Sequence, residues 1–236
     1  MKRLELQRAV SVIACTKRPA YMNVLFRNYG RQAYRNKELI VILNRDSMNL
    51  TDYMAAAKPY PNVRIFRLPE HVSLGACLNF GVKRARFHFI AKFDDDDYYA
   101  PLYLTDSMRS LLKTQADIVG KRAHYMYLNG SRSLLLRYPH LENQYVPVVQ
   151  GATLLAKRRV FRQVAFRNRN RGESVRFCSD SRAKGFRIYS GRKNYFMAIR
   201  RKHSKDHTWI VSDAKLLSGR VKLLKGDNIK RIVNRS

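Results

Sequence analysis

The chain has 236 residues, and its 47 Lys and Arg against 17 Asp and Glu give a formal net charge of +30. Hydrophobic residues form 45% of the composition, enough for a packed core, and no window approaches the roughly 18 apolar residues of a membrane-spanning helix. The three cysteines lie far apart without paired metal spacing, so we expect reduced core thiols in a cytoplasmic protein rather than a secreted disulfide scaffold.

The first hundred residues alternate strand-like and helix-like stretches. Ala9–Cys15 is a continuous apolar, β-branched run, which is typical of a strand buried on both faces. The alternation continues with strands at Glu38–Leu43, Val63–Leu68 and Phe87–Phe93, and with helices from Pro19 through Tyr29, over Leu50–Ala57, and from the N-cap Ser73 to about Arg86. The pattern predicts βαβ units in a mainly parallel α/β sheet, and such sheets bind ligands at the carboxyl ends of their strands.

After Pro101 the pattern changes. Asn129-Gly130 is a strong turn signal and predicts a hairpin between Ala123–Leu128 and Leu134–Tyr138. The other predicted elements are helices at Leu102–Thr114, Arg158–Val164 and Val175–Lys184, and strands at Val146–Leu155, Arg187–Tyr189 and Tyr195–Ile199. From about Val211 to Ser236 the chain is basic and amphipathic, and we expect a tail that lies on anionic membrane or packs on the domain.

Four consecutive aspartates, Asp94 to Asp97, follow the fourth predicted strand directly. Two carboxylates about 4 Å apart repel by roughly 4 kcal/mol at an effective dielectric constant near 20, so water, cations or a metal must relieve them. Alternate residues such as Asp94 and Asp96 can face one side while Asp95 points away. Mg²⁺ and Mn²⁺ take carboxylate oxygens and keep positions for substrate phosphates. The run therefore predicts a metal–diphosphate site, with a solvated acidic turn as the alternative.

The segments VSVIACTKRP, ELIVILNRDS, SLGACLNFGVKRA and FHFIAKFDDDDYYAP occur in the order and spacing of family 2 glycosyltransferases, which the chain resembles over residues 8–210. The resemblance implies the GT-A fold over residues 1–210, a Rossmann-like nucleotide-binding α/β sandwich. Its donor half would span about 8–101 and its acceptor half about 102–210, followed by a basic tail at 211–236. It also implies metal-dependent, inverting transfer of a sugar from a nucleotide-diphosphate sugar, normally UDP-linked, to a hydroxyl acceptor in cell-surface or spore polysaccharide synthesis.

The resemblance assigns roles on the donor side. Alignment of Pro101 with the family's downstream proline places the DxD motif on Asp94 to Asp96. Asp96 is then the ligand of Mn²⁺ or Mg²⁺, and Asp94 and Asp95 face the ribose or sugar. The further nucleotide contacts that the resemblance implies are Thr16 and Arg18 after the first strand, Asn44 or Asp46 after the second, and Asn79 in an Asn-x-Gly motif. Because Asn44-Arg45 replaces the family's acidic pair, the base preference stays open.

Inverting members use a carboxylate as general base, commonly the Asp of a Glu-Asp pair at the start of a late helix. Here Glu173 matches the Glu, but Ser174 stands in the Asp position, and serine needs an activating partner to act as a base. Three interpretations stay open: Glu173 is the base, Asp180 is the base, or catalysis is impaired. Late in the chain, His207 is a candidate metal or diphosphate ligand, and Arg200 and Arg201 are candidate partners of the departing diphosphate.

The charge of +30 attracts polyanions such as nucleic acid, anionic lipid, teichoic-type polymers and nucleotide diphosphates. The sequence has no zinc-finger, RNP-like or helix-turn-helix pattern, so nucleic acid is not the expected partner. The expected acceptor carries a hydroxyl on a glycan, a lipid-linked glycan or a protein. The alternative function is an impaired GT-A domain that binds an acidic polymer or a membrane surface. A nucleotidyltransferase is disfavoured because no Gly-rich basic signature follows the first strand.

Overall fold

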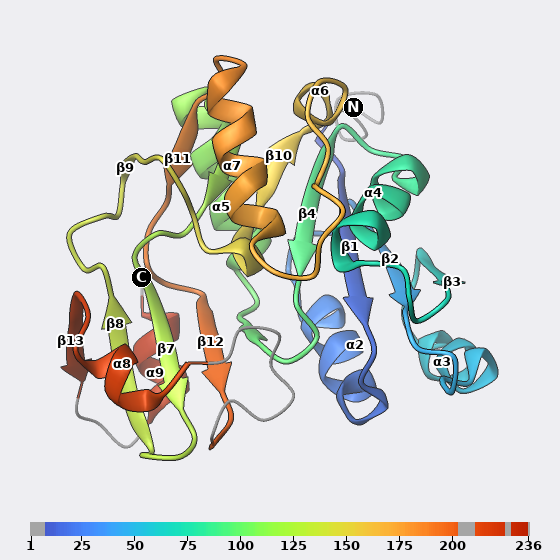
Figure 1. The fold of residues 1–236 in the computed structure, drawn as a ribbon, viewed down its shortest axis with the longest axis horizontal. Helices are drawn as coiled ribbons and strands as arrows, with labels where there is room; N and C mark the ends of the chain where they lie inside the picture. Colours follow the sequence, from blue (N-terminus) through green and yellow to red (C-terminus); the bar gives the residue numbers. More distant parts are fainter. Residues whose placement is uncertain (1–7, 203–210, 225–227, 236) are drawn as a thin grey trace.

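Two β-sheets form the framework of this computed structural model, which describes residues 8–202, 211–224 and 228–235 (Figure 1). The larger, eight-stranded sheet has the order β3-β2-β1-β4-β10-β6-β11-β9. Its strands are β1 (Val10–Thr16), β2 (Lys37–Leu43), β3 (Val63–Arg67), β4 (Phe89–Phe93), β6 (Ile118–Gly120), β9 (Gln144–Tyr145), β10 (Leu155–Lys157) and β11 (Ile188–Ser190). The first four strands in the chain pair in parallel, as predicted, whereas β10 runs antiparallel to both β4 and β6.

Helices cover both faces of the larger sheet because successive side chains of its buried strands point to opposite sides. On one face Val12 and Val41 pack with α2 (Met22–Gly30), α3 (Leu50–Ala57) and α5 (Tyr103–Thr114). On the other face Ile13 and Ile40 pack with α4 (Leu74–Arg84), α6 (Arg158–Phe161) and α7 (Glu173–Ala183). The helix at Leu50–Ala57 has the bounds predicted from the sequence, and Ser73 caps α4 by accepting a hydrogen bond from the Ala76 amide.

The second sheet has five strands in the order β13-β8-β7-β12-β5. Its members are β5 (Tyr98–Tyr99), β7 (His124–Leu128), β8 (Ser133–Arg137), β12 (Phe196–Arg200) and β13 (Val221–Leu224). The hairpin of β7 and β8 confirms the turn predicted at Asn129-Gly130. β12 lies parallel to β7, and β13 closes the outer edge of β8 in antiparallel pairing.

The described part of the segment from Val211 onward packs on the domain, which is one of the two alternatives expected for it. Its described residues form α8 (Asp213–Leu217), β13 and α9 (Ile229–Asn234). Leu216 and Val233 are buried in the main core, and the Val233 carbonyl accepts a hydrogen bond from the Tyr195 amide at 2.9 Å. The described residues after 210 thus contribute to the main core, and β13 supplies the strand that pairs with the edge of β8.

The strand predicted at Val146–Leu155 is also wrong over most of its length. Only Leu155 enters a strand, β10, and a 3-10 turn, η2 (Gly151–Thr153), precedes it. Gly151 lies so close to α7 that an added Cβ would come within 2.8 Å of Ser174 Cβ and Oγ. The close approach of η2 to the start of α7 replaces extended pairing here.

Another 3-10 turn, η1 (Pro19–Tyr21), leads into α2. Within the described residues, every helix is too short or too polar to cross a membrane.

Candidate active site

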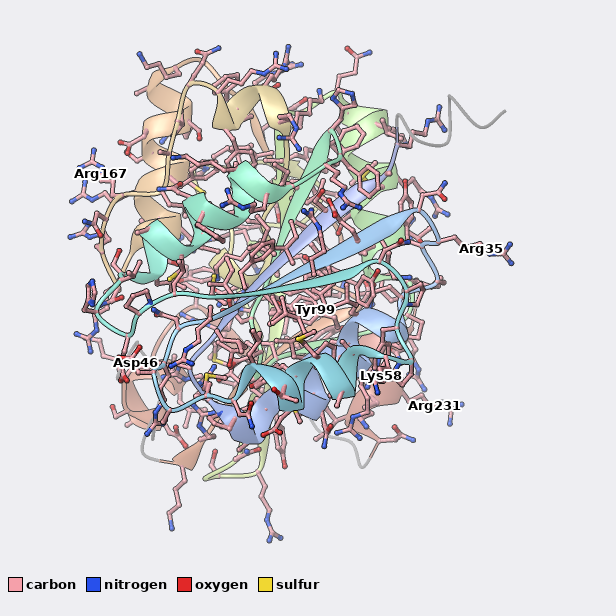
Figure 2. All side chains as sticks on the ribbon, turned by 90° about the vertical axis from the view of Figure 1, so that its right-hand side faces the viewer. Arg35, Asp46, Lys58, Tyr99, Arg167 and Arg231 are labelled. Atoms are coloured by element: carbon pink, nitrogen blue, oxygen red, sulfur yellow. The ribbon has the colours of Figure 1, made fainter. Side chains whose placement is uncertain are left out.

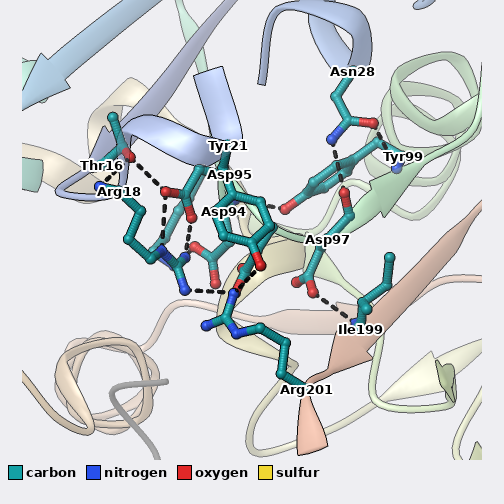
Figure 3. Close-up of polar contacts among 12 residues, drawn as sticks. Thr16, Arg18, Tyr21, Asn28, Asp94, Asp95, Asp97, Tyr99, Ile199 and Arg201 are labelled. Atoms are coloured by element: carbon teal, nitrogen blue, oxygen red, sulfur yellow. Dashed lines mark hydrogen bonds and ion pairs between the residues drawn. The ribbon is translucent and has the colours of Figure 1, made fainter. Parts of the chain in front are cut away.

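The carboxyl ends of β1 and β4 lie side by side, and the aspartate run begins there (Figure 3). Its four side chains have different surroundings. The Asp94 side chain is 38% exposed and pairs with the Lys92 ammonium, whereas Asp95, Asp96 and Asp97 are buried. This confirms that the run is not a solvated acidic turn.

Asp95 braces the loop after β1. Its Oδ2 accepts hydrogen bonds from Thr16 Oγ1 at 2.5 Å and from Arg18 Nε at 3.2 Å, and its Oδ1 pairs with the same guanidinium. Burial raises the pKa of Asp95, and the charge of Arg18 opposes that rise. Neither Asp95 nor Thr16 is among the residues that line the cavity described below, and the donor contacts expected of both stay a prediction.

Asp96 is held between two guanidiniums. Its Oδ2 accepts a hydrogen bond from Arg18 at 2.7 Å and pairs with Arg201 at 3.3 Å. The Tyr21 ring lies 5.0 Å from each guanidinium carbon, and its hydroxyl accepts a hydrogen bond from Arg201 at 2.5 Å (Figure 3). Cations, one of the three expected means of relieving the carboxylates, lie beside Asp96, and the arrangement brings the end of β12 to the end of β1.

Asp97 joins the two sheets. Its Oδ1 accepts a hydrogen bond from the Ile199 amide of β12 at 2.9 Å, and its carbonyl accepts one from Asn28 Nδ2 at 2.8 Å. Burial raises the pKa of Asp97 well above its usual value, and the charges of Asp96 and Asp94 add to the rise. This residue therefore fixes the aspartate run against the second sheet.

A cavity of about 500 Å³ opens between the aspartate run and the second sheet. Asp94, Asp96 and Asp97 line one side together with Lys92 and Arg18. The remaining wall comes from the start of α7 and from the second sheet, with Glu173, Ser174, Arg122, His124, Met126, Arg137, Tyr138, Ala198 and Arg200 among its residues. The cavity thus combines carboxylates, cations and an apolar floor at the edge where ligands bind parallel sheets.

Glu173 is the first residue of α7, and both it and Ser174 are buried. The preceding Gly172 has φ +67°, a left-handed conformation that glycine adopts without strain. Ser174 Oγ donates a hydrogen bond to Glu173 Oε1 at 2.8 Å, which orients the carboxylate. Burial acts to lower the pKa of Lys92, but the charges of Asp94 and Glu173 outweigh it and hold that pKa above its usual value. Lys92 therefore stays charged between the aspartates and Glu173.

Asp180, the other candidate base, lies outside the cavity. Both of its carboxylate oxygens accept hydrogen bonds at 2.8 Å from Arg167, whose side chain projects from the surface in Figure 2. The hydrogen bond from Arg167 lowers the pKa of Asp180, which makes this carboxylate a weaker base. Its ion pair instead ties α7 to the loop before it.

Three other predicted nucleotide contacts brace loops and do not line the cavity. Asn44 Nδ2 donates to the Pro69 carbonyl at 2.8 Å, and Asp46, at the surface in Figure 2, accepts from the Glu70 amide at 3.2 Å. Asn79 makes two hydrogen bonds to the backbone of Phe166, at 2.8 and 2.9 Å. These contacts favour a structural role for Asn79. His207 lies outside the described residues.

Lys92, Arg122, His124, Arg137 and Tyr138 are cavity residues that the sequence analysis did not single out. Lys92 has a signal in the sequence, because a lysine inside the apolar run of β4 needs a nearby anion. The other four lie in or beside β7 and β8, and no motif marks them. The pairing of β8 with β7 and of β7 with β12 places them in the sheet beside the cavity.

The carboxylate oxygens at the cavity suit a hard divalent cation that also binds a ligand. Asp94 and Asp96 both line the cavity, and carboxylate oxygens are the donors that Mg²⁺ and Mn²⁺ prefer. No group of three His, Cys, Asp or Glu side chains gathers as a metal site within residues 8–202, 211–224 and 228–235. The residues therefore fit a metal that completes its coordination with phosphate oxygens.

His124 gives the protein a predicted acid sensitivity. Burial lowers the pKa of His124 to about 3, and the cations Arg137, Arg122 and Lys121 act in the same direction, against a hydrogen bond to the Arg122 carbonyl. Between about pH 6.5 and 3 the unfolded chain binds a proton that the folded protein does not. The free energy of unfolding should therefore decrease as the pH is lowered through this range, by at most about 1.4 kcal/mol per pH unit. Chemical denaturation at pH 7 and pH 5 should show a smaller pH effect for His124→Asn, while the exposed His140→Asn keeps the wild-type effect.

Comparisons with known proteins agree with this geometry. The model of the family "Glycosyl transferase family 2" matches residues 11–187. The O-antigen biosynthesis glycosyltransferase WbnJ of Escherichia coli is 28% identical over 134 residues, which are 56% of this chain and 52% of WbnJ. The chain thus spans about half the length of this curated relative.

Solved structures show the same fold at low sequence identity. S. aureus TarS 1-349 in complex with UDP-GlcNAc has a TM-score of 0.68 and 16% identity, over 86% of this chain and 62% of TarS 1-349. The mannosyltransferase PcManGT from Pyrobaculum calidifontis, in complex with GDP-Man and Mn²⁺, has a TM-score of 0.64 and 15% identity, over 84% of this chain and 58% of PcManGT. These matches confirm the expected GT-A fold.

Proposed function

Because the chain belongs to glycosyl transferase family 2, we propose that it transfers a sugar from a nucleotide-diphosphate sugar to a hydroxyl acceptor in polysaccharide synthesis. The observation that carries the proposal is one cavity lined by Asp94, Asp96 and Glu173 together with buried cations. The complexes of TarS with UDP-GlcNAc and of PcManGT with GDP-Man support a nucleotide-sugar donor. We assign UDP as the donor nucleotide, and the role of WbnJ in O-antigen synthesis supports a glycan acceptor.

In this proposal the aspartate run binds the diphosphate end of the donor. Asp96, with Asp94, would hold Mn²⁺ or Mg²⁺, which would supply positive charge for the departing diphosphate. Arg18 and Arg201 already lie beside Asp96, at 2.7 and 3.3 Å, so their guanidiniums can pair with phosphate oxygens in the same space. The charge that develops on the leaving group thus meets fixed positive groups.

Glu173 is the proposed general base. Its carboxylate takes the proton of the acceptor hydroxyl while that oxygen attacks the anomeric carbon from the face opposite the diphosphate. The new bond joins the acceptor oxygen to the anomeric carbon, the bond from that carbon to the diphosphate oxygen breaks, and the configuration inverts. Ser174 keeps Glu173 oriented through the hydrogen bond of 2.8 Å and takes no proton itself.

The test is a thermal unfolding series with UDP, GDP, ADP and CDP, each with Mn²⁺ and with EDTA. A ligand that binds only the folded state raises the melting temperature by mass action. We expect a shift with UDP that requires Mn²⁺ and smaller shifts with the other nucleotides. No shift with any nucleotide would contradict the donor site and leave the polymer-binding alternative, which Ser174 in the usual Asp position favours.

A further inference from the structure

The loop between α6 and α7 is strongly basic. From Lys157 to Gly172 the sequence has seven Lys and Arg and no Asp or Glu. Its last part, Arg167 to Arg171, alternates Arg and Asn, and we call these five residues the arginine loop. All five are exposed, and Figure 2 shows Arg167 at the left-hand side of the molecule. The proposed sugar transfer assigns no role to this loop.

The asparagines fasten the arginine loop to the start of α4. Asn168 Oδ1 accepts a hydrogen bond from Ser73 Oγ at 2.5 Å. Two residues further on, Asn170 Oδ1 accepts a hydrogen bond from the Leu74 amide at 2.8 Å. In an extended segment alternate side chains point to opposite sides, so asparagines that bind the protein leave the arginines between them exposed.

The backbone of the arginine loop also lies close to α4. The Arg169 carbonyl accepts a hydrogen bond from the Gly75 amide at 3.1 Å. A Cβ added at Gly75 would collide with the Arg167 carbonyl, so only glycine lets the loop lie this close to the helix. The loop is therefore held in place by contacts that do not use its arginine side chains, apart from the ion pair of Arg167 with Asp180.

The arginine loop and the adjacent turn of α7 carry more cations than anions. The hydrogen bond from Arg167 lowers the pKa of Asp180, and the charge of Arg176, exposed on α7, acts in the same direction. None of the ion pairs in the described part of the chain involves Arg169 or Arg176. This surface therefore keeps a net positive charge, which attracts anions.

The arginine loop also borders the cavity, next to an exposed apolar side chain. Asn170 and Arg171 line the cavity, and so does Val175, which is 57% exposed. Val175 lies two residues after the proposed base Glu173. Cations beside an exposed apolar side chain suit the interface of an anionic membrane, where the cations meet lipid headgroups and the apolar group leaves water. A soluble acidic polymer would need the charges alone.

We propose that the arginine loop, with Val175 and Arg176, docks the protein on an anionic lipid surface that carries the acceptor. The inference rests on the proposed function, and it places the acceptor hydroxyl on a membrane-borne molecule. Docking in this way brings the rim of the cavity beside Glu173 to the lipid headgroups. The basic segment after residue 210 was the other candidate for membrane contact, but its described part packs on the domain.

The test is sedimentation of the full chain with two kinds of vesicle, phosphatidylcholine alone and an equimolar mixture of phosphatidylcholine and phosphatidylglycerol. We expect the protein to bind only the anionic vesicles. The double variant Arg169→Gln/Arg176→Gln should bind them about thirtyfold more weakly, because each cation near an anionic surface strengthens binding about fivefold. Val175→Ser should weaken binding about fivefold or more, since its apolar surface no longer gains from leaving water.

The matched control is Arg35→Gln/Arg231→Gln, which removes the same charge from exposed positions on the opposite, right-hand side of Figure 2. This variant should bind the anionic vesicles nearly as well as the wild type, because salt screens charges that lie far from the lipid. Equal losses in the two double variants would overturn the docking surface, and so would a wild type that does not sediment with anionic vesicles.

Two further measurements separate the proposals. A polymer site would bind poly-L-glutamate as tightly as the vesicles and would be unaffected by Val175→Ser, and that result would make the membrane assignment wrong. UDP titrated with Mn²⁺ should bind Arg169→Gln/Arg176→Gln as it binds the wild type, because neither arginine lines the cavity. Failure of UDP to bind the wild type would count against the proposed function, whereas sedimentation without nucleotide would still decide the docking surface.

Discussion

Replacement of Asp96 by asparagine should abolish Mn²⁺-dependent nucleotide binding and lower sugar transfer by at least about a hundredfold. Asparagine keeps the shape of the side chain but removes the charge that attracts a divalent cation. Asp96 is the carboxylate that lies between Arg18 and Arg201 at the cavity, so its loss also leaves two guanidiniums without their shared partner. Titration of UDP with Mn²⁺ and with EDTA measures the first effect, and transfer of radiolabelled sugar measures the second.

Two other aspartates serve as controls for Asp96. Asp52→Asn, at an exposed position in the first turn of α3, should leave both measurements at the wild-type level. Asp95→Asn should mainly lower the melting temperature, because Asp95 binds Thr16 and Arg18 in the loop after β1 and does not line the cavity. If Asp96→Asn binds UDP with Mn²⁺ as well as the wild type does, the metal assignment is wrong.

Glu173→Gln should separate binding from chemistry. The amide cannot accept the acceptor proton, so turnover should fall by about a hundredfold to ten-thousandfold, the range that general base catalysis supplies. The glutamine can still accept the hydrogen bond from Ser174 Oγ, so the start of α7 should keep its structure. Donor affinity should therefore stay unchanged, as measured by UDP titration with Mn²⁺, while single-turnover transfer slows.

The matched control for Glu173 is Asp180→Asn, which changes the rival carboxylate on the same helix. Because Asp180 pairs with Arg167 outside the cavity, we expect normal turnover and a small loss of stability. Loss of turnover in Asp180→Asn together with full activity in Glu173→Gln would reverse the assignment. Ser174→Ala should slow transfer only severalfold, since Ser174 positions the base and does not replace it.

The sequence predicted the first hundred residues well because their central strands are buried on both faces. The runs Val10–Thr16 and Lys37–Leu43 contain enough consecutive apolar residues that few other structures can accommodate them, and both are strands of the central sheet. Because the aspartate run directly follows the fourth of these strands in the chain, its position at the carboxyl end of that strand could also be predicted. The turn at Asn129-Gly130 is likewise encoded by adjacent residues, and it predicted the hairpin of β7 and β8.

What the sequence could not predict depends on contacts between distant segments. Val221–Leu224 is a strand because the edge of β8 needs a partner, and its own apolar residues fit a helix equally well. Asp95 and Asp96 are neighbours of one residue type, yet one braces a loop and the other lines the cavity. The difference comes from where Thr16 and Arg201 lie in space. The cavity residues Arg122 and Arg137 were missed for the same reason, because the fold brings both of them to the Tyr138 ring.

While a ribosome makes this chain, β8 is complete long before its neighbour β13 exists. Until residues 221–224 have been synthesised, the outer edge of β8 leaves unpaired the backbone groups that later bond to β13, and Leu134 and Leu136 lie on that strand. Open strand edges template association with other chains, so the nascent protein is most prone to aggregate, and most dependent on chaperones, during this interval. The four parallel strands β1 to β4 can pair much earlier, so folding during synthesis should form that part of the larger sheet first and the sheet that carries Arg137 last.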